Sequence, residues 1–275
     1  MNERIGFIGL GDQGGPMARR IGLAGFDLTL WARRPEVLAG FADLGATFAP
    51  SIAALGAECT VVGVCVFDDA GVAGVVGELL RVMKPGSVIL IHSTVTPGLC
   101  KDLAQDGAAR GIAVLDAPVS GGSERALDGE LTVMVGGDAA AFARVQPVIA
   151  AFAKTVVRLG EAGAGQHCKL INNAVATVHF ATALAFFEAG ERLGLDRAAL
   201  VEILSGGSAQ SFGIQMMAGI GSERLAFALP RLDKDVALML EVFADAGLDD
   251  LRAVDQSRRG LKDFAAYAHA GAAQA

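Results

Sequence analysis

RIGFIGLGDQGGPMARRIGLAG, at residues 4–25, contains an apolar run, a cluster of glycines and then a stretch with apolar residues at helical spacing. Gly9, Gly11 and Gly14 form a GxGxxG motif between the expected strand and the expected helix. In this context the first glycine permits a tight turn, the second permits close approach of a pyrophosphate, and the third permits close packing of helix and strand. The helix N-terminus adds N–H donors and a positive dipole. We therefore predict a dinucleotide-binding turn, rather than a glycine turn without a ligand, made by Gly9, Leu10, Gly11, Asp12, Gln13 and Gly14.

Beyond this turn, apolar β-rich runs alternate with helix-like stretches as far as residue 160. Such alternation predicts a parallel sheet covered by helices on both faces. The pattern changes after Gly165, where a long apolar helix and only helical segments follow. The expected fold is an α/β Rossmann-type, doubly wound N-terminal domain (1–162) joined by a long helix to an all-α substrate and dimerisation domain (163–275). The expected strands are 4–10, 26–31, 60–66, 87–92, 112–117, 131–137 and 155–160.

Composition limits the function classes. Hydrophobic residues make up 52% of the chain and charged residues 19%, which favours a packed core over disorder. The formal net charge of -7 argues against nucleic-acid or anionic-membrane binding. Every apolar run meets a charge, proline or glycine cluster within about 18 residues, so no membrane span is expected. The N-terminus shows no secretion signal, and we expect a cytoplasmic protein without a metal site, whose four cysteines are buried thiols: Cys59, Cys65, Cys100 and Cys168.

The residues after the second expected strand indicate which dinucleotide is bound. Enzymes that prefer NAD usually place an acidic residue there to accept a hydrogen bond from the ribose 2′-hydroxyl. Here Arg33 and Arg34 occupy that stretch. A guanidinium can pair with a 2′-phosphate through two hydrogen bonds. NADP is the expected cofactor, and NAD is the alternative. If these residues bind no ligand, Arg33 and Arg34 are simply solvated loop arginines.

Four ordered motifs resemble the β-hydroxyacid dehydrogenase family: GFIGLGDQGGPMA (6–18), DAPVSGG (116–122), GAGQHCKLINN (163–173) and LDKD (232–235). That family includes 3-hydroxyisobutyrate dehydrogenases, tartronate semialdehyde reductases and glyoxylate or succinic semialdehyde reductases. The resemblance extends to about residue 240. It implies NAD(P)-dependent hydride transfer between a small β-hydroxy acid and its semialdehyde or keto acid.

The resemblance also implies individual roles. Lys169 matches the catalytic lysine of the family, and Asn173 matches an amide that orients the substrate. The loop of Ser120, Gly121 and Gly122 matches the loop that holds the substrate carboxylate. The residues themselves agree with these roles, because Lys169 and Asn173 share one helix face and an apolar helix disfavours the charged form of a lysine. Glycines after Ser120 leave backbone N–H groups able to face an anion. By the same resemblance Thr94, Val66 and Phe67 lie beside the nicotinamide and Lys234 closes over the cofactor, although a capping pair in the first turn of a helix also explains Lys234 and Asp235.

Two other functions compete with this expectation. An imine reductase resembles the family but carries a different residue where Lys169 stands. A non-catalytic NADP-binding module would have no need for Lys169, Asn173 and Ser120 together. The resemblance also implies that residues 205–232 help to line the substrate pocket, and their few polar groups predict a pocket more apolar than one for tartronate semialdehyde. The long apolar helix predicts a homodimer or homotetramer.

Overall fold

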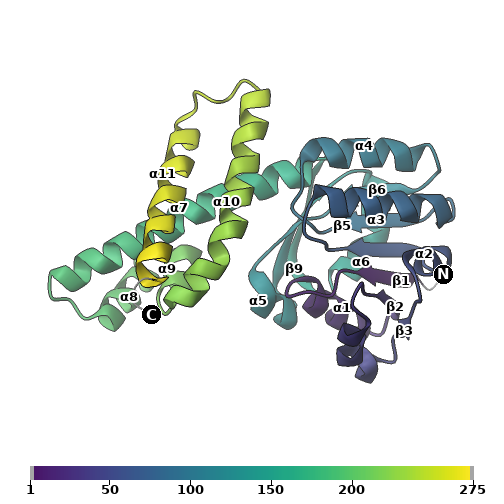
Figure 1. The fold of residues 1–275 in the computed structure, drawn as a ribbon, viewed down its shortest axis with the longest axis horizontal. Helices are drawn as coiled ribbons and strands as arrows, with labels where there is room; N and C mark the ends of the chain where they lie inside the picture. The colour runs from purple at the N-terminus through teal and green to yellow at the C-terminus, as the bar shows by residue number, and fades with distance from the viewer. Residues whose placement is uncertain (1–2, 273–275) are drawn as a thin grey trace. The chain divides into compact units, whose positions relative to one another are not determined.

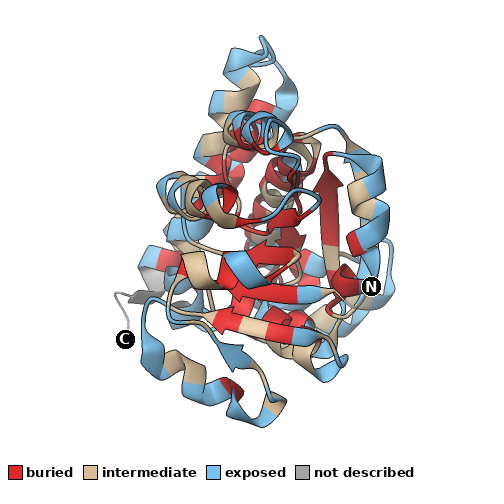
Figure 2. Ribbon diagram, turned by 90° about the vertical axis from the view of Figure 1, so that its right-hand side faces the viewer, coloured by how far each residue is buried: buried red, intermediate tan, exposed pale blue. Residues whose placement is uncertain are grey.

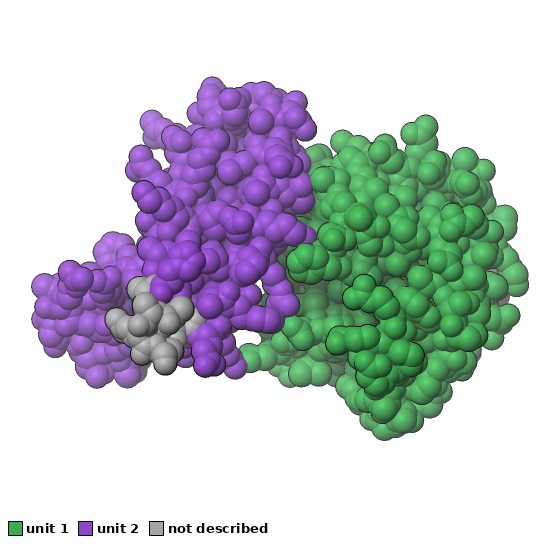
Figure 3. All heavy atoms as spheres, viewed as in Figure 1, with its two compact units in different colours: residues 1–169 green, residues 170–275 purple. Residues whose placement is uncertain are grey.

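The computed structural model describes residues 3–272. The chain divides into two compact units, residues 1–169 and 170–275 (Figure 3). The first contains a nine-stranded sheet flanked by helices, and the second is helical. The expected fold class, a doubly wound domain followed by an all-α domain, is confirmed.

The sheet contains the seven expected strands and two short additional ones, Thr47–Phe48 and Val119–Ser120. Its order is β3-β2-β1-β4-β5-β6-β8-β7, with β9 also paired to β8. The strands are β1 (Arg4–Ile8), β2 (Asp27–Trp31), β3 (Thr47–Phe48), β4 (Val61–Val64), β5 (Val88–Ile91), β6 (Ala113–Asp116), β7 (Val119–Ser120), β8 (Leu131–Gly136) and β9 (Ala153–Gly160).

The expectation of a wholly parallel sheet needs one correction. The strands from β3 to β6 are parallel, but β8 runs antiparallel to both β6 and β7. The direction reverses because β7 and a short helix, α5 (Gly122–Asp128), return the chain instead of a full crossover helix. The alternation of strands and helices along the sequence does not reveal the direction in which a strand runs.

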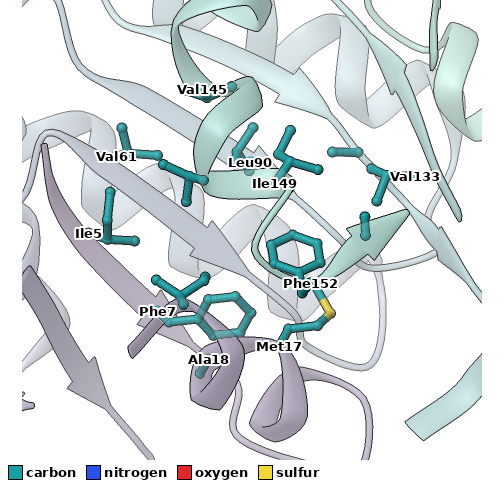
Figure 4. Close-up of a cluster of buried hydrophobic side chains, with 14 of the residues drawn as sticks. Ile5, Phe7, Met17, Ala18, Val61, Leu90, Val133, Val145, Ile149 and Phe152 are labelled. Carbon is teal, nitrogen blue, oxygen red and sulfur yellow. The ribbon is translucent and has the colours of Figure 1, made fainter. Parts of the chain in front are cut away.

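Helices cover both faces of the sheet (Figure 1). One face packs against α1 (Gly14–Leu23), the 3-10 segment η1 (Pro35–Leu44), α5 and α6 (Ala139–Ile149). The other packs against α2 (Ile52–Glu58), α3 (Asp69–Val82) and α4 (Pro97–Ala108). Phe7 joins the first core, beside Met17 and Phe152, and its neighbour Ile8 joins the second (Figure 4). This is the two-residue alternation of a strand buried on both faces, and Figure 2 shows the strands of the sheet as largely buried.

The second unit is built on α7 (Ala164–Arg192), which begins in the first unit. It continues with α8 (Arg197–Gly206), α9 (Phe212–Met217), α10 (Ser222–Asp245) and α11 (Arg252–Ala272). Phe187, Met217 and Phe264 are buried in its main core. Helix α10 continues through Pro230, and α11 extends to Ala272.

Helix α7 is long and apolar enough, by length and composition, to cross a membrane, with a mean hydropathy of 1.5 over its most apolar window. Lys169 and Glu188 interrupt the apolar run of this helix as expected, but the 18 residues between them are enough to meet the criterion. The core helix of a soluble protein meets the same criterion, so the finding is weak support for a membrane span.

Candidate active site

Five neighbouring parallel strands end at one edge of the sheet, and each is followed by a segment predicted to belong to the site. Ligands of open α/β sheets bind outside the carboxyl ends of the strands. The segments are Arg33–Arg34 after β2, Gly9–Gly14 after β1, Val66–Phe67 after β4, Thr94 after β5 and Ser120–Gly122 after β6. The first unit therefore brings these segments to one edge.

The turn after β1 has the geometry that the glycine motif predicts. Gly9 has φ +96, and a Cβ there would lie 2.0 Å from the Cys65 carbonyl oxygen. A Cβ on Gly14 would lie 1.9 Å from the Gly9 carbonyl oxygen, so no larger residue fits. In contrast, a Cβ on Gly11 would meet no protein atom within 4 Å. The open space above Gly11, at the start of α1, fits a dinucleotide pyrophosphate.

Arg33 and Arg34 are both exposed, between the end of β2 and the start of η1. Within residues 3–272 their guanidinium groups form no hydrogen bond or ion pair with another side chain. Arg19 holds the segment that follows them, because its guanidinium pairs with both oxygens of Asp43 at 2.7 and 3.0 Å. The two loop arginines thus stand on an anchored segment with their charges available to an anion.

Hydrogen bonds join the segments that follow β4, β5 and β6. The Ser93 hydroxyl accepts from the Val66 N–H at 2.8 Å, and His92 contacts the Ala117 carbonyl through Nδ1 at 2.8 Å. Burial lowers the pKa of His92 to about 4, which keeps the imidazole neutral near pH 7. Thr94 is half-buried, and Phe67 is 72% exposed. Phe67 therefore places a large exposed aromatic ring at the carboxyl edge of the sheet, where ligands of this fold bind.

Lys169 is buried in the second turn of α7, with 8% of its surface exposed. The start of that helix is attached to the sheet by Asp116, whose carboxylate accepts from the Gly163 N–H at 2.7 Å and the Gln166 N–H at 2.9 Å. Asp116 thereby satisfies N–H groups that a helix N-terminus leaves without a partner. Burial raises the pKa of Asp116, and these backbone hydrogen bonds oppose that rise.

Ser120 lies half-buried in β7, and Gly121 and Gly122 follow at the start of α5. Both glycines have positive φ, +136 and +78. A Cβ on Gly121 would lie 2.9 Å from Leu131. The loop therefore requires glycine at Gly121 for space and at both positions for backbone conformation.

The second unit contains the other predicted residues. Asn173 lies on α7, one turn after Lys169, and its side-chain amide donates to Asp235 at 2.5 Å. Lys234 lies 3.8 Å from the same carboxylate, measured from Nζ to Oδ1. Lys234 and Asp235 both lie in the middle of α10 and not in its first turn. The alternative explanation, that they form a capping pair at the start of a helix, is therefore wrong.

Two residues of this arrangement, Asp116 and Gln166, have no role predicted from the sequence, and Asp235 was expected only as the capping partner of Lys234. Asp116 and Gln166 stand inside the DAPVSGG and GAGQHCKLINN motifs, so the motifs themselves were the available signal. The four cysteines are free thiols, but the expectation that all are buried is wrong for Cys65 and Cys168, which are half-buried, and correct for Cys59 and Cys100.

Comparison with known families agrees with this arrangement. Residues 4–160 match the model of the NAD binding domain of 6-phosphogluconate dehydrogenase. Residues 163–271 match the model described as NAD-binding of NADP-dependent 3-hydroxyisobutyrate dehydrogenase. The two matches meet near residue 160, close to the start of α7.

Individual relatives are similar over most of the chain. L-threonate dehydrogenase of Cupriavidus necator is 40% identical over 217 residues, which are 77% of this chain and 73% of that protein. The structure of Mycobacterium tuberculosis 3-hydroxyisobutyrate dehydrogenase with L-serine is 26% identical, with a TM-score of 0.81 over 98% of this chain and 99% of that one. Psf3 in complex with NADP+ and 2-OPP is 26% identical, with a TM-score of 0.84 over 97% and 94%. An imine reductase from Pseudomonas sp., at 19% identity and a TM-score of 0.66 over 94% of this chain and 99% of that one, shares the fold alone.

Proposed function

The chain belongs to the 3-hydroxyisobutyrate dehydrogenase family of NAD(P)-binding oxidoreductases, and from this premise we propose that it interconverts a small β-hydroxy acid and its semialdehyde or keto acid with NADP. The observation that carries the proposal is Lys169. It is a buried lysine on a helix whose first turn is hydrogen-bonded to the carboxyl edge of the dinucleotide-binding sheet.

Lys169 is the proton-transfer group in this proposal. In oxidation its neutral amine accepts the hydroxyl proton while a carbonyl forms at the same carbon, and in reduction its ammonium returns that proton to the oxygen. When bound, the nicotinamide accepts or supplies the hydride.

Ser120, Gly121 and Gly122 hold the substrate carboxylate. The positive φ of the two glycines turns backbone N–H groups of the loop in a direction that L residues rarely allow, and the hydroxyl adds a donor. Asn173 orients the substrate oxygen, and its hydrogen bond to Asp235 restricts the rotation of the amide. Orientation by the side chain of Asn173 lowers the entropic cost of reaching the reactive geometry.

NADP preference rests on Arg33 and Arg34. Their exposed guanidinium groups follow β2, where the ribose of a bound dinucleotide lies in this fold. The family description of the second unit and the NADP+ held by Psf3 support the same cofactor. An acidic residue at either position would repel a 2′-phosphate.

The test compares Lys169→Ala with Lys154→Ala, which removes an exposed lysine from β9. NADPH consumption is measured with glyoxylate, succinic semialdehyde, methylmalonate semialdehyde and tartronate semialdehyde, with NADH in parallel. Lys169→Ala should lower kcat by about 10²–10⁴-fold and leave NADPH affinity nearly intact. Lys154→Ala should behave like the wild type. Near-wild-type kcat in Lys169→Ala would refute the assigned role.

Asn173→Ala provides a second, different outcome. Because the amide has no proton to exchange in the reaction, its loss should raise KM and lower kcat by less than Lys169→Ala does. The wild-type pH profile of kcat should show a single ionisation, which should disappear in Lys169→Ala and persist in Asn173→Ala. An ionisation that persists in Lys169→Ala would mean that another group titrates.

We also propose that the second unit mediates homodimerisation. Ile171, Val175 and Phe186 are exposed and lie along one stripe of α7, which is apolar yet only partly buried. Sedimentation should give a dimer at micromolar concentration. Phe186→Glu should shift it toward monomer, whereas Leu248→Glu, at an exposed leucine after α10, should not. A monomeric wild type would overturn this proposal.

A further inference from the structure

The Gln166 side chain is fully buried in the first turn of α7, with 0% of its surface exposed. Its Nε2 donates to the Ser93 carbonyl at 2.8 Å, and its Oε1 accepts from the Val95 N–H at 3.2 Å. These two backbone groups lie on either side of Thr94. One amide therefore holds both neighbours of the residue that follows β5 at the site edge.

The backbone of Gln166 is held from the opposite side. Its N–H donates to Asp116, which is 1% exposed at the end of β6. Close packing leaves that carboxylate no room to move, because a Cβ on Gly136 or Gly165 would lie 2.5 or 2.8 Å from its oxygens. Gln166 thus links the ends of β5 and β6 to one turn of α7.

Lys169 lies three residues after Gln166, so the two side chains project from nearly the same face of the helix. We propose that Gln166 is a positioning residue, which holds the Thr94 segment and Lys169 in one register so that hydride transfer at the substrate carbon and proton transfer at its oxygen occur on the same group. This inference rests on the proposed function. A displacement of about 1 Å in such a geometry can lower the rate by about 100-fold.

Two substitutions separate shape from hydrogen bonding. Gln166→Leu keeps a similar volume and removes both hydrogen bonds, so kcat should fall by about 10- to 100-fold while NADPH affinity stays within about twofold, because the glycine turn is elsewhere. Gln166→Glu replaces the amide by a carboxyl of the same shape. Protonated, it can donate to Ser93 and accept from Val95, whereas the ionised form cannot donate.

The carboxyl variant should therefore regain activity at low pH. Burial and the nearby Asp116 favour its protonated form, so the ratio of its kcat to that of the wild type should rise as the pH falls. Val145→Ala is the matched control, because it removes a buried side chain of α6 in the same unit without touching these hydrogen bonds. It should lower the stability and leave kcat and its pH profile unchanged.

Hydrogen exchange of the unliganded protein gives a readout that needs no turnover. The Val95 amide should exchange faster in Gln166→Leu than in the wild type or Val145→Ala. If Gln166→Leu keeps the wild-type exchange rate of the Val95 amide and the wild-type kcat, while Lys169→Ala is inactive, the positioning role of Gln166 is wrong. The proposed function would then still stand. A wild type that neither reduces any of these aldehydes with NADPH nor oxidises the corresponding hydroxy acids with NADP would overturn the proposed function, whatever the exchange rate of the Val95 amide.

Discussion

His92 makes the stability of the first unit depend on pH. The imidazole is 3% exposed, stacks on Phe7 with ring centroids 5.9 Å apart and meets the edge of Phe152 at 5.5 Å. Because the Ala117 carbonyl can only accept a hydrogen bond, Nδ1 carries the proton of the neutral ring. Burial lowers the pKa of His92 from its ordinary value of 6.5 to about 4 in the folded protein.

The sign follows from proton binding. Between pH values of about 4 and 6.5 the unfolded chain binds a proton at His92 that the folded chain does not, so the free energy of unfolding falls as the pH falls. Each pKa unit of difference corresponds to about 1.36 kcal/mol, which makes the whole effect about 3 kcal/mol. Roughly 2 kcal/mol of it is lost between about pH 7.5 and about pH 5.

His92→Asn isolates this contribution. The asparagine amide can still donate to the Ala117 carbonyl, but it does not titrate, so the stability of the variant depends less on pH. Asp116 acts with the opposite sign, since its raised pKa makes the folded chain the better proton binder, and it is present in both proteins. Urea unfolding at the two pH values should show a stability loss smaller by about 2 kcal/mol in the variant. Parallel losses in the two proteins would refute the reasoning.

Two further predictions concern the cofactor. Gly11→Ala should leave the melting temperature unchanged but weaken NADPH binding, since its Cβ meets no protein atom and enters the space for the pyrophosphate. Gly14→Ala should lower both the melting temperature and the affinity for NADPH, because its Cβ would lie 1.9 Å from the Gly9 carbonyl oxygen. Equal melting temperatures for the two variants, measured beside fluorescence titrations with NADPH, would contradict this account. Arg33→Asp should weaken NADPH binding by about 10- to 150-fold and NADH binding far less, as fluorescence titrations can measure. Equal losses for the two cofactors would exclude a contact between Arg33 and the 2′-phosphate.

Local pattern was enough to predict most of the fold. The turn around Gly9 and Gly14 is a local feature, because one positive φ and one close contact define it within a few residues. The seven longer strands are also local features, since alternate burial on two faces appears directly in their composition. The direction of β8 is not a local feature, because it depends on how β8 pairs with β6, a strand that is separate in the sequence.

The site divides in the same way. The sequence by itself determined which residue types stand after each strand, and hence the placement of Arg33, Thr94 and Ser120 along one sheet edge. Only the tertiary structure decided how the helix bearing Lys169 is attached to that edge. Asp116 and Gln166 are 50 residues apart and meet only after β6 and α7 have packed together. Periodicity within a segment cannot encode such a contact, because its energy exists only when both segments are folded and water is excluded from the hydrogen bonds between them.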